Sequence, residues 1–309
     1  MRILHLSDTH LMAPGEFHNP DFNGGTDPAQ MLTDALHRLR HLDRLDLVVV
    51  SGDVSDDGTV DSYQLGARLI GGWARERGAE VVWAVGNHDE RGAFRRVLGN
   101  GVAGAVPDEG LPAGGHPGEA PVYGVTTVAG RRVVTVDSQV SGRIEGRVDA
   151  GQLAWLRGVL AQPAGGTVLV CHHPPIAPHT PLHHGIELQN PAELLDVLAG
   201  SDVELILSGH YHHPVIESVT VAGGDGGTGT GPRSVPVLVS HGIINTSDLL
   251  CEPGWEQSMR TSGALLVEWG TGGDRARVRT HPLQLADHPL AIQYDPAEVA
   301  RLKESFRQP

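Results

Sequence analysis

The sequence has few cysteines, an excess of acidic over basic residues, and no long apolar run. Its 309 residues include only two cysteines, Cys171 and Cys251, which excludes a disulfide framework and predicts two reduced thiols. There are 37 acidic and 23 basic residues, giving a formal net charge of −14, and the basic residues form no stripe. This charge balance argues against nucleic acid or an anionic membrane as the main partner.

The amino-terminal segment contains no long apolar stretch. Residues 1–8 run directly into a predicted strand, without the apolar stretch that a signal peptide or a membrane span requires. We therefore expect a cytoplasmic protein without a membrane span.

What the sequence does contain is an alternation of short β-rich runs with helical stretches, which predicts a single globular α/β body. Polar motifs follow nearly all of the first six strands, at the ends where the loops of an open α/β sheet converge on one site. The predicted strands are 2–7, 47–51, 80–85, 132–137, 167–171 and 203–208, then 215–221, 235–240, 264–268 and 276–280. The predicted helices are 28–42, 60–77, 150–160 and 191–198.

Seven side chains suited to metal binding occur in five short motifs, D-x-H, G-D, G-N-H-D, H-H-P and G-H-x-H. They offer oxygen and imidazole donors without thiolates, which suit Mn, Fe, Zn or Co rather than a structural zinc cage. Seven ligands are too many for one ion, and a carboxylate can bridge two, so the set predicts a dinuclear centre of the kind that acts at phosphorus. The seven are Asp8, His10, Asp53, Asn87, His172, His210 and His212.

In this order and spacing, the five motifs resemble those of the calcineurin-like metallophosphoesterases, over residues 3 to about 213. The resemblance implies a four-layer αββα sandwich, in which two mixed β-sheets are flanked by helices. It also implies two divalent ions, with manganese or iron as the expected metals. The ligand set that it implies is Asp8, His10 and His212 for one ion, Asn87, His172 and His210 for the other, and Asp53 as the bridge between them.

The resemblance further implies hydrolysis by a hydroxide that bridges the two ions and attacks phosphorus in line. His88 directly follows Asn87, so its imidazole should reach the same cavity, bind the phosphoryl group together with Asn87, and protonate the leaving alkoxide. Asp89 either orients His88 or caps a helix that begins near residue 90. His173 and His184 are further candidates for substrate contact, with a purely structural role as the alternative.

A finer resemblance is to the bacterial class III cyclic nucleotide phosphodiesterases. It is carried by G-N-H-D-E-R at 86–91, V-D-S at 136–138 ahead of Q-L-A-W-L at 152–156, and H-H-P-P-I at 172–176. It implies hydrolysis of 3′,5′-cyclic AMP to AMP, with a homodimer as one oligomeric state. The stretch after Asp53 has no arginine to clamp a dianionic monoester, which favours a diester. A phosphomonoesterase or nucleotidase, a glycerophosphodiesterase and a non-catalytic metal-binding scaffold are the alternatives.

The last predictions concern the domain boundaries. Residues 1–285 are expected to form the catalytic domain. Residues 286–309 are expected to form a tail or a short helix, with a helical pattern at 297–306, that packs on the body or on a partner subunit. The glycine-rich run 223–231 is expected to be a flexible hairpin tip.

Overall fold

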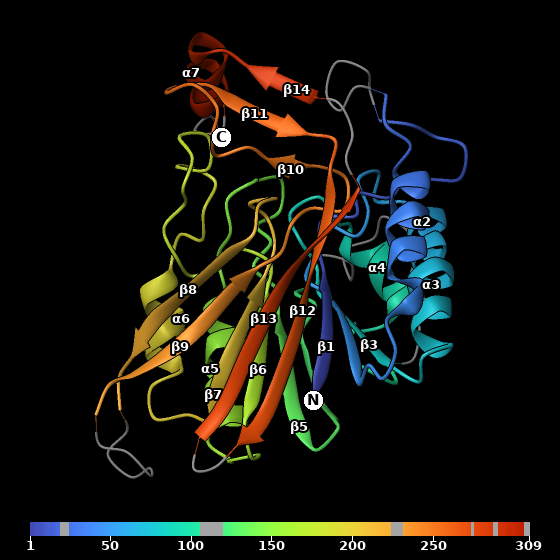
Figure 1. Cartoon of the computed structure of the whole chain (residues 1–309). Coiled ribbons are helices and arrows are strands. Elements are labelled where there is room, and N and C mark those ends of the chain that lie inside the picture. The colour runs from blue at the N-terminus through green and yellow to red at the C-terminus, as the bar shows by residue number, and fades with distance from the viewer. Residues whose placement is uncertain (19–24, 106–119, 224–230, 273–274, 287–289, 306–309) are drawn as a thin grey trace.

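The computed structural model describes residues 1–18, 25–105, 120–223, 231–272, 275–286 and 290–305. Two β-sheets stack face to face, and helices cover the outer face of each sheet (Figure 1). The four-layer α/β/β/α arrangement expected from the sequence is therefore confirmed.

The first sheet has the strand order β13-β12-β1-β2-β3. Its three parallel strands are β1 (Arg2–Leu6), β2 (Leu47–Val50) and β3 (Glu80–Trp83). β12 (Ser262–Gly272) runs antiparallel to β1, and β13 (Arg275–Ala286) runs antiparallel to β12. Since β2 is buried along its whole length, its sequence is a continuous apolar run rather than an alternating one.

The second sheet has the order β4-β5-β6-β7-β9-β8. Four strands are parallel and form its centre, and an antiparallel strand closes each edge. The parallel strands are β5 (Arg131–Val136), β6 (Thr167–Cys171), β7 (Val203–Ser208) and β9 (Arg233–Val239). The edge strands are β4 (Gly124–Val128) and β8 (Val215–Val221).

Three apolar clusters hold these layers together. The middle cluster lies between the sheets and combines Ile3, Leu47 and Val49 of the first sheet with Val168 and Leu205 of the second. The outer clusters bury one face of each helix against its sheet. The helices on the first sheet are α2 (Pro28–Arg38), α3 (Val60–Arg75) and α4 (Arg91–Leu98), and those on the second are α5 (Ala150–Leu160) and α6 (Pro191–Val197).

The helix starts follow from local capping. Asp27 accepts a hydrogen bond from the Gln30 amide, and Pro28 occupies the first turn of α2. α2 ends at Arg38, and a 3₁₀ turn (Leu39–His41) completes the segment that was predicted as one helix. At α4 the cap is Glu90, which accepts from the amides of Gly92 and Ala93, so the prediction that Asp89 caps this helix is wrong.

A third, smaller sheet lies beyond the upper ends of the two large sheets in Figure 1. It has the order β10-β11-β14, formed by β10 (Thr246–Ser247), β11 (Glu256–Met259) and β14 (Leu290–Tyr294), and α7 (Pro296–Ser305) follows it. None of these three strands was predicted, and β4 was also missed. The helix predicted at 297–306 corresponds to α7, whereas Phe306 and most of the predicted hairpin tip, residues 224–230, lie outside the described residues.

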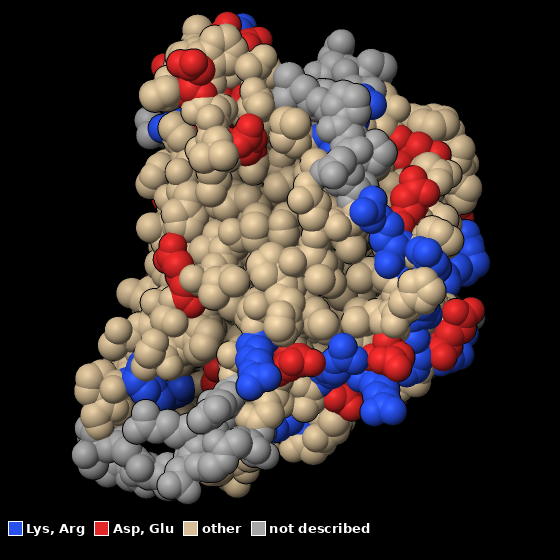
Figure 2. Space-filling model, viewed as in Figure 1, with Lys and Arg blue, Asp and Glu red and all other residues tan. Residues whose placement is uncertain are grey.

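Two surface properties complete the description. No helix within the described parts of the chain is long and apolar enough to cross a membrane. On the face shown in Figure 2, basic and acidic side chains are interspersed along the lower and right-hand edges, and a broad central area carries few charges.

Candidate metal centre

Every candidate ligand lies just past the carboxyl end of a parallel strand. Asp8 and His10 follow β1, Asp53 follows β2, and Asn87 lies four residues past the end of β3. The second sheet supplies the rest in the same way, with His172 after β6 and His210 and His212 after β7. The polar ends of both sheets thus meet at one end of the sandwich, as the general rule for α/β sheets requires. We call the seven residues together the candidate metal centre.

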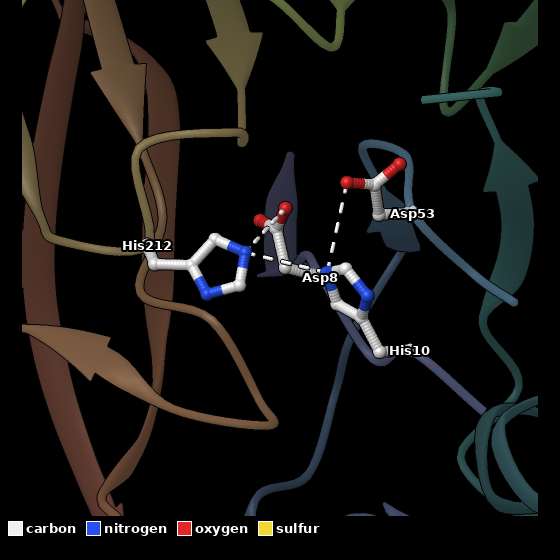
Figure 3. A group of neighbouring side chains, drawn as sticks. All are labelled: Asp8, His10, Asp53 and His212. Atoms are coloured by element: carbon white, nitrogen blue, oxygen red, sulfur yellow. Dashed lines mark hydrogen bonds and ion pairs between the residues drawn. The ribbon is translucent and has the colours of Figure 1, made fainter. Parts of the chain in front are cut away.

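Their potential ligand atoms form two groups that share one carboxylate. In the first group, atoms of Asp8, His10, Asp53 and His212 lie within 4.8 Å of one another, and in the second the same holds for Asp53, His172 and His210. Figure 3 shows the four side chains of the first group turned toward one another. Nε2 of His212 is 3.3 Å from Nε2 of His10 and 3.3 Å from Oδ1 of Asp8. Asp53 therefore stands where a bridging ligand would stand.

Each of the four imidazoles is anchored through one ring nitrogen, which leaves the other for a cation. Nδ1 pairs with Oδ1 of Asp56 in His10, with the Ser51 carbonyl in His172, and with Oδ1 of Asn245 in His212, at 2.6–2.9 Å. His210 reverses this pattern, because its Nε2 donates to the Ile186 carbonyl at 2.8 Å. Such partners fix the tautomer and the orientation of a metal-ligating histidine.

Two buried polar atoms at the site make no regular hydrogen bond among the described residues. Oδ1 of Asn87 has no partner, and Nε2 of His172 faces the Asp53 carboxylate at 3.2 Å. Leaving a buried polar group unsatisfied is costly, so the Asn87 oxygen in particular calls for an explanation. Both atoms are good donors to a divalent cation. Together with the two ligand groups that share Asp53, they show that these side chains fit a pair of divalent metal ions.

The Asp53 carboxylate is prepared for such a bridge. Its Oδ1 accepts the backbone amide of His88 at 2.9 Å, while Oδ2 lies 3.2 Å from Nε2 of His172 and 3.6 Å from Nε2 of His10. Burial raises the pKa of Asp53, but the imidazoles of His172 and His88 outweigh burial and hold this pKa well below its usual range. The carboxylate is therefore ionised and aims one oxygen between the two groups.

The backbone at the centre adopts a conformation that side chains other than glycine rarely take. Seven non-glycine residues in the described parts of the chain have a positive φ, and five of them are candidate ligands. These are Asp8 (53°), His10 (44°), Asp53 (48°), His210 (69°) and His212 (54°). Each such residue costs of the order of 1–3 kcal/mol, so the surrounding packing must impose it, and residues of this kind gather at functional sites.

Glycines in the motifs allow the loops to approach one another. A Cβ at Gly86 would collide with the Asp53 side chain, and one at Gly209 would collide with Oγ of Ser7 and lie 2.6 Å from Oδ2 of Asp8. Glycine carries a hydrogen atom in place of Cβ, which leaves room for the carboxylates and explains why a glycine precedes Asn87 and His210.

His88 faces the same cavity, and its position is set by a residue that the sequence analysis missed. Oδ1 of Asp56 lies 3.0 Å from Nδ1 of His88 and 2.8 Å from Nδ1 of His10, so one carboxylate orients both rings. Burial opposes protonation of His88, but Asp53 and Asp56 outweigh it and raise the pKa to about 9. The one available signal for Asp56 was a second carboxylate three residues past Asp53, which in sequence resembles an ordinary polar loop.

Asp89 joins two ligand-bearing loops. Its carboxylate accepts from the amides of Val54 and Ser55 on the Asp53 loop, from the amide of Gly86, and from the hydroxyl of Tyr63. Burial and the nearby Asp53 raise the pKa of Asp89 to about 7. Asp89 therefore ties the position of Asp53 to that of Asn87, and its carboxylate makes no hydrogen bond to His88 among the described residues.

A pocket of about 500 Å³ opens above the centre, within the range of small-molecule sites. His173 and His184 do not line it. His173 is buried, with one ring nitrogen against the Ser138 hydroxyl and the other donating to the Ile144 carbonyl, and His184 is exposed. His183 lines the pocket instead. The polar lining comprises His10, Asp53, Asp56, Asn87, His88, Arg143, His183, His210, His212, Asn245, Ser247 and Ser258, and the remainder is mainly apolar: Gly142, Ile144, Leu182, Ile186, Tyr294 and Leu302.

A four-layer sandwich that carries two ligand groups on one shared carboxylate has the architecture of a two-metal hydrolase. Comparison with known families agrees with this class. Residues 1–214 match the calcineurin-like phosphoesterase family, and the chain belongs to this family.

Several relatives are similar over most of their length. The chain is 36% identical over 264 residues to a probable cyclic nucleotide phosphodiesterase of Rhodococcus erythropolis, covering 82% of this chain and 75% of the relative. It is 34% identical over 254 residues to a cAMP/cGMP dual specificity phosphodiesterase of Mycobacterium tuberculosis, covering 82% and 70%. It is 31% identical over 215 residues to the 3′,5′-cyclic adenosine monophosphate phosphodiesterase CpdA of Escherichia coli, covering 69% and 70%.

Among solved structures, the purple acid phosphatase PPD1 of yellow lupin superposes with a TM-score of 0.56 at 13% identity. The match covers 97% of this chain, and this chain spans 55% of the lupin protein. At this identity the likeness concerns the fold alone.

Proposed function

We propose that the protein is a dinuclear-metal phosphodiesterase that hydrolyses 3′,5′-cyclic AMP to AMP. The observation that carries the proposal is the pair of ligand groups joined by Asp53 beneath a pocket that His88 also lines. The names of the relatives in Rhodococcus, Mycobacterium and Escherichia support a cyclic nucleotide as the substrate.

We assign the seven residues of the candidate metal centre as the sequence analysis did, with Asp53 as the shared ligand. Two bound divalent ions, manganese or iron, would supply an activated water and neutralise charge on the phosphoryl oxygens. With Oδ1 of Asn87 committed as a ligand, the amide nitrogen of the same side chain remains free to donate a hydrogen bond to a phosphoryl oxygen.

His88 is the proton donor in this proposal. Its Nδ1 is held by Asp56, so Nε2 is the atom that delivers a proton to the 3′ oxygen as the phosphorus–oxygen bond breaks. Asp56 acts through His88 and His10, which makes it a positioning residue. Because the same carboxylate holds a metal ligand and the acid, it fixes their separation.

The deciding experiment compares wild type with Asp53→Ala in the presence of Mn²⁺, following AMP formation from cyclic AMP by chromatography. The wild type should turn over, and the variant should lose more activity than the roughly 10- to 100-fold typical of an outer partner, because the shared ligand itself is gone. Asp61→Ala, on the exposed side of α3, is the matched control and should behave as wild type. Full activity of Asp53→Ala against cyclic AMP and against bis(p-nitrophenyl) phosphate would refute the proposal.

One observation favours a second candidate, a phosphomonoesterase acting at the same centre. No arginine follows Asp53, but Arg143 lines the pocket from the loop between β5 and α5 and offers a guanidinium that suits a dianionic phosphate. Phosphate release from AMP that outpaces AMP formation from cyclic AMP would select this alternative. A panel that adds glycerophosphodiesters to these two substrates would distinguish all three activities.

We further propose that the protein acts in the cytoplasm. The support is that both cysteines are unpaired, Cys171 in a buried position and Cys251 in a partly exposed one. Free thiols persist where glutathione and thioredoxin keep them reduced. Fractionation of cells that express the full chain would test this.

A further inference from the structure

The pocket lining combines polar and apolar side chains from distant parts of the chain. Its imidazoles and carboxylates come from loops of both large sheets. The lining also includes Leu182 from the loop after β6, Tyr294 at the end of β14, and Leu302 on α7. We call these three residues the upper wall. In Figure 1 the small sheet and α7 lie beyond the upper ends of the large sheets, and the three residues line the same pocket as the centre.

The upper wall is assembled by contacts between distant parts of the chain. Tyr294 lies opposite Glu256 in the antiparallel pairing of β14 with β11. The Glu256 carboxylate is buried and accepts the backbone amide of Leu182 at 2.7 Å. Glu256 thus fixes the loop that carries Leu182 to the strand that pairs with the Tyr294 strand.

The small sheet is also anchored to the metal centre itself. Oδ1 of Asn245 lies 2.6 Å from Nδ1 of His212, and β10 begins at the next residue. The Ser247 amide then donates to the His212 carbonyl at 3.0 Å. The distance between the centre and the upper wall is therefore set by a short, hydrogen-bonded segment.

Tyr294 has the properties of a contact residue. Its side chain is half-buried, and its hydroxyl has no hydrogen-bond partner among the described residues. Burial and Glu298 raise the pKa of this hydroxyl, so it remains a donor at neutral pH. An aromatic ring that lines a pocket together with two leucines offers an apolar surface on which a nucleobase can stack.

We propose that the upper wall is the subsite for the nucleobase of the substrate, with Tyr294 as the stacking residue. The inference rests on the proposed function and adds to it, because it assigns base recognition to residues past 286 that the sequence analysis treated as a tail. A phosphate at the centre would place the ribose in the middle of the pocket, beside Ser247 and Ser258, and the base against Tyr294.

The test uses the full chain loaded with Mn²⁺ and compares two diesters, cyclic AMP and glycerophosphoethanolamine, which has no base. Tyr294→Ala should raise KM for cyclic AMP by at least about fivefold, as loss of one base–aromatic stack predicts. Its kcat/KM for glycerophosphoethanolamine should stay within about twofold of wild type, which also shows that the variant is folded. Leu302→Ala should act in the same direction, and Tyr294→Phe should keep most of the affinity because the ring remains.

The matched control is Gln293→Ala, which changes the exposed neighbour of Tyr294 on the same strand and should leave both substrates unaffected. A second readout is the affinity for AMP, measured by calorimetry without turnover, which should weaken by the same factor in Tyr294→Ala. Equal effects on both diesters, or unchanged AMP affinity in Tyr294→Ala, would overturn the base subsite.

Different results would refute the proposed substrate and the proposed base subsite. A wild type that cleaves glycerophosphoethanolamine but not cyclic AMP refutes the proposed substrate, and AMP affinity then decides the base subsite independently. A wild type that cleaves cyclic AMP with the same KM as Tyr294→Ala refutes the base subsite alone.

Discussion

The candidate metal centre and the upper wall line the same pocket but are built in opposite ways. The centre stands on loops that leave buried parallel strands, with five ligands in left-handed backbone and anchored imidazoles. The upper wall comes from a loop, one short strand and a helix, and its three residues are partly exposed. Catalysis at the centre requires ligand atoms in fixed positions, whereas substrate recognition at the upper wall requires only an apolar surface of suitable shape. We therefore expect substitutions at the centre to affect turnover and those at the wall to affect affinity.

Among substitutions outside the ligands themselves, the largest effect is expected where a ligand loop has no room to move. Gly209→Ala would push a methyl group into Ser7 and the Asp8 carboxylate and displace a ligand. A shift of about 1 Å at a reacting centre costs about 10²-fold, so kcat/KM should fall by about that factor, together with the bound metal content. Gly71→Ala in α3 is the control, since a Cβ there meets nothing within 4 Å. Wild-type kinetics for Gly209→Ala would show that the loops are not tightly constrained.

The next effect concerns the carboxylate that orients two rings at once. Asp56→Asn weakens the hold on His10 and on His88, and loss of such an outer partner typically costs 10- to 100-fold in metal affinity or activity. We expect both Mn²⁺ affinity, by titration calorimetry, and kcat for cyclic AMP to fall within that range. Asp61→Asn on the surface of α3 serves as control. If only kcat falls, Asp56 would act through His88 alone.

A smaller effect is expected from the support of the upper wall. Glu256→Ala removes the acceptor of the Leu182 amide without touching the metal centre. Loss of one hydrogen bond of about 1 kcal/mol corresponds to roughly fivefold, and it should appear in KM for cyclic AMP while kcat is retained. Steady-state kinetics with both diesters provide the measurement. A fall in kcat equal to that of Asp56→Asn would break the distinction between centre and wall.

The smallest effect is expected at the thiols. Burial raises the pKa of Cys171 to about 12 and keeps it inert, whereas Cys251 is partly exposed. A disulfide reagent should therefore titrate one thiol in the native protein and two in denaturant. Modification of Cys251 should leave kcat unchanged. Rapid reaction of both native thiols would show that the strand end at β6 opens readily.

The fold was predictable where strand patterns and motifs coincided. The runs that became β1, β2, β6 and β7 are short, apolar and each followed by a polar motif. β10, β11 and β14 escaped prediction because none of them is a continuous apolar run, and β14 pairs with a strand more than thirty residues earlier in the chain. Pairing at that separation depends on tertiary contacts that no local pattern records.

Within the site, residue type and order pointed to the seven candidate ligands, and the structure brings all seven to one end of the sandwich. Other features depend on three-dimensional neighbours. Asp56 acquires its role only because His10 and His88 meet on either side of it, and His183 rather than His184 reaches the pocket because the loop turns that side inward. The positive φ of five ligands could not be predicted from the sequence, because aspartate and histidine adopt many other backbone conformations.

The segment 245–247 links the metal centre to the pocket lining. Asn245 steadies His212, and Ser247, two residues later, belongs to the pocket lining. Under the proposed function, a nucleotide that displaces this segment would shift His212 and change the affinity for the metal ion. By thermodynamic linkage, the metal ion would then change the affinity for the nucleotide by the same factor. Metal occupancy would in that case set how tightly the nucleotide binds.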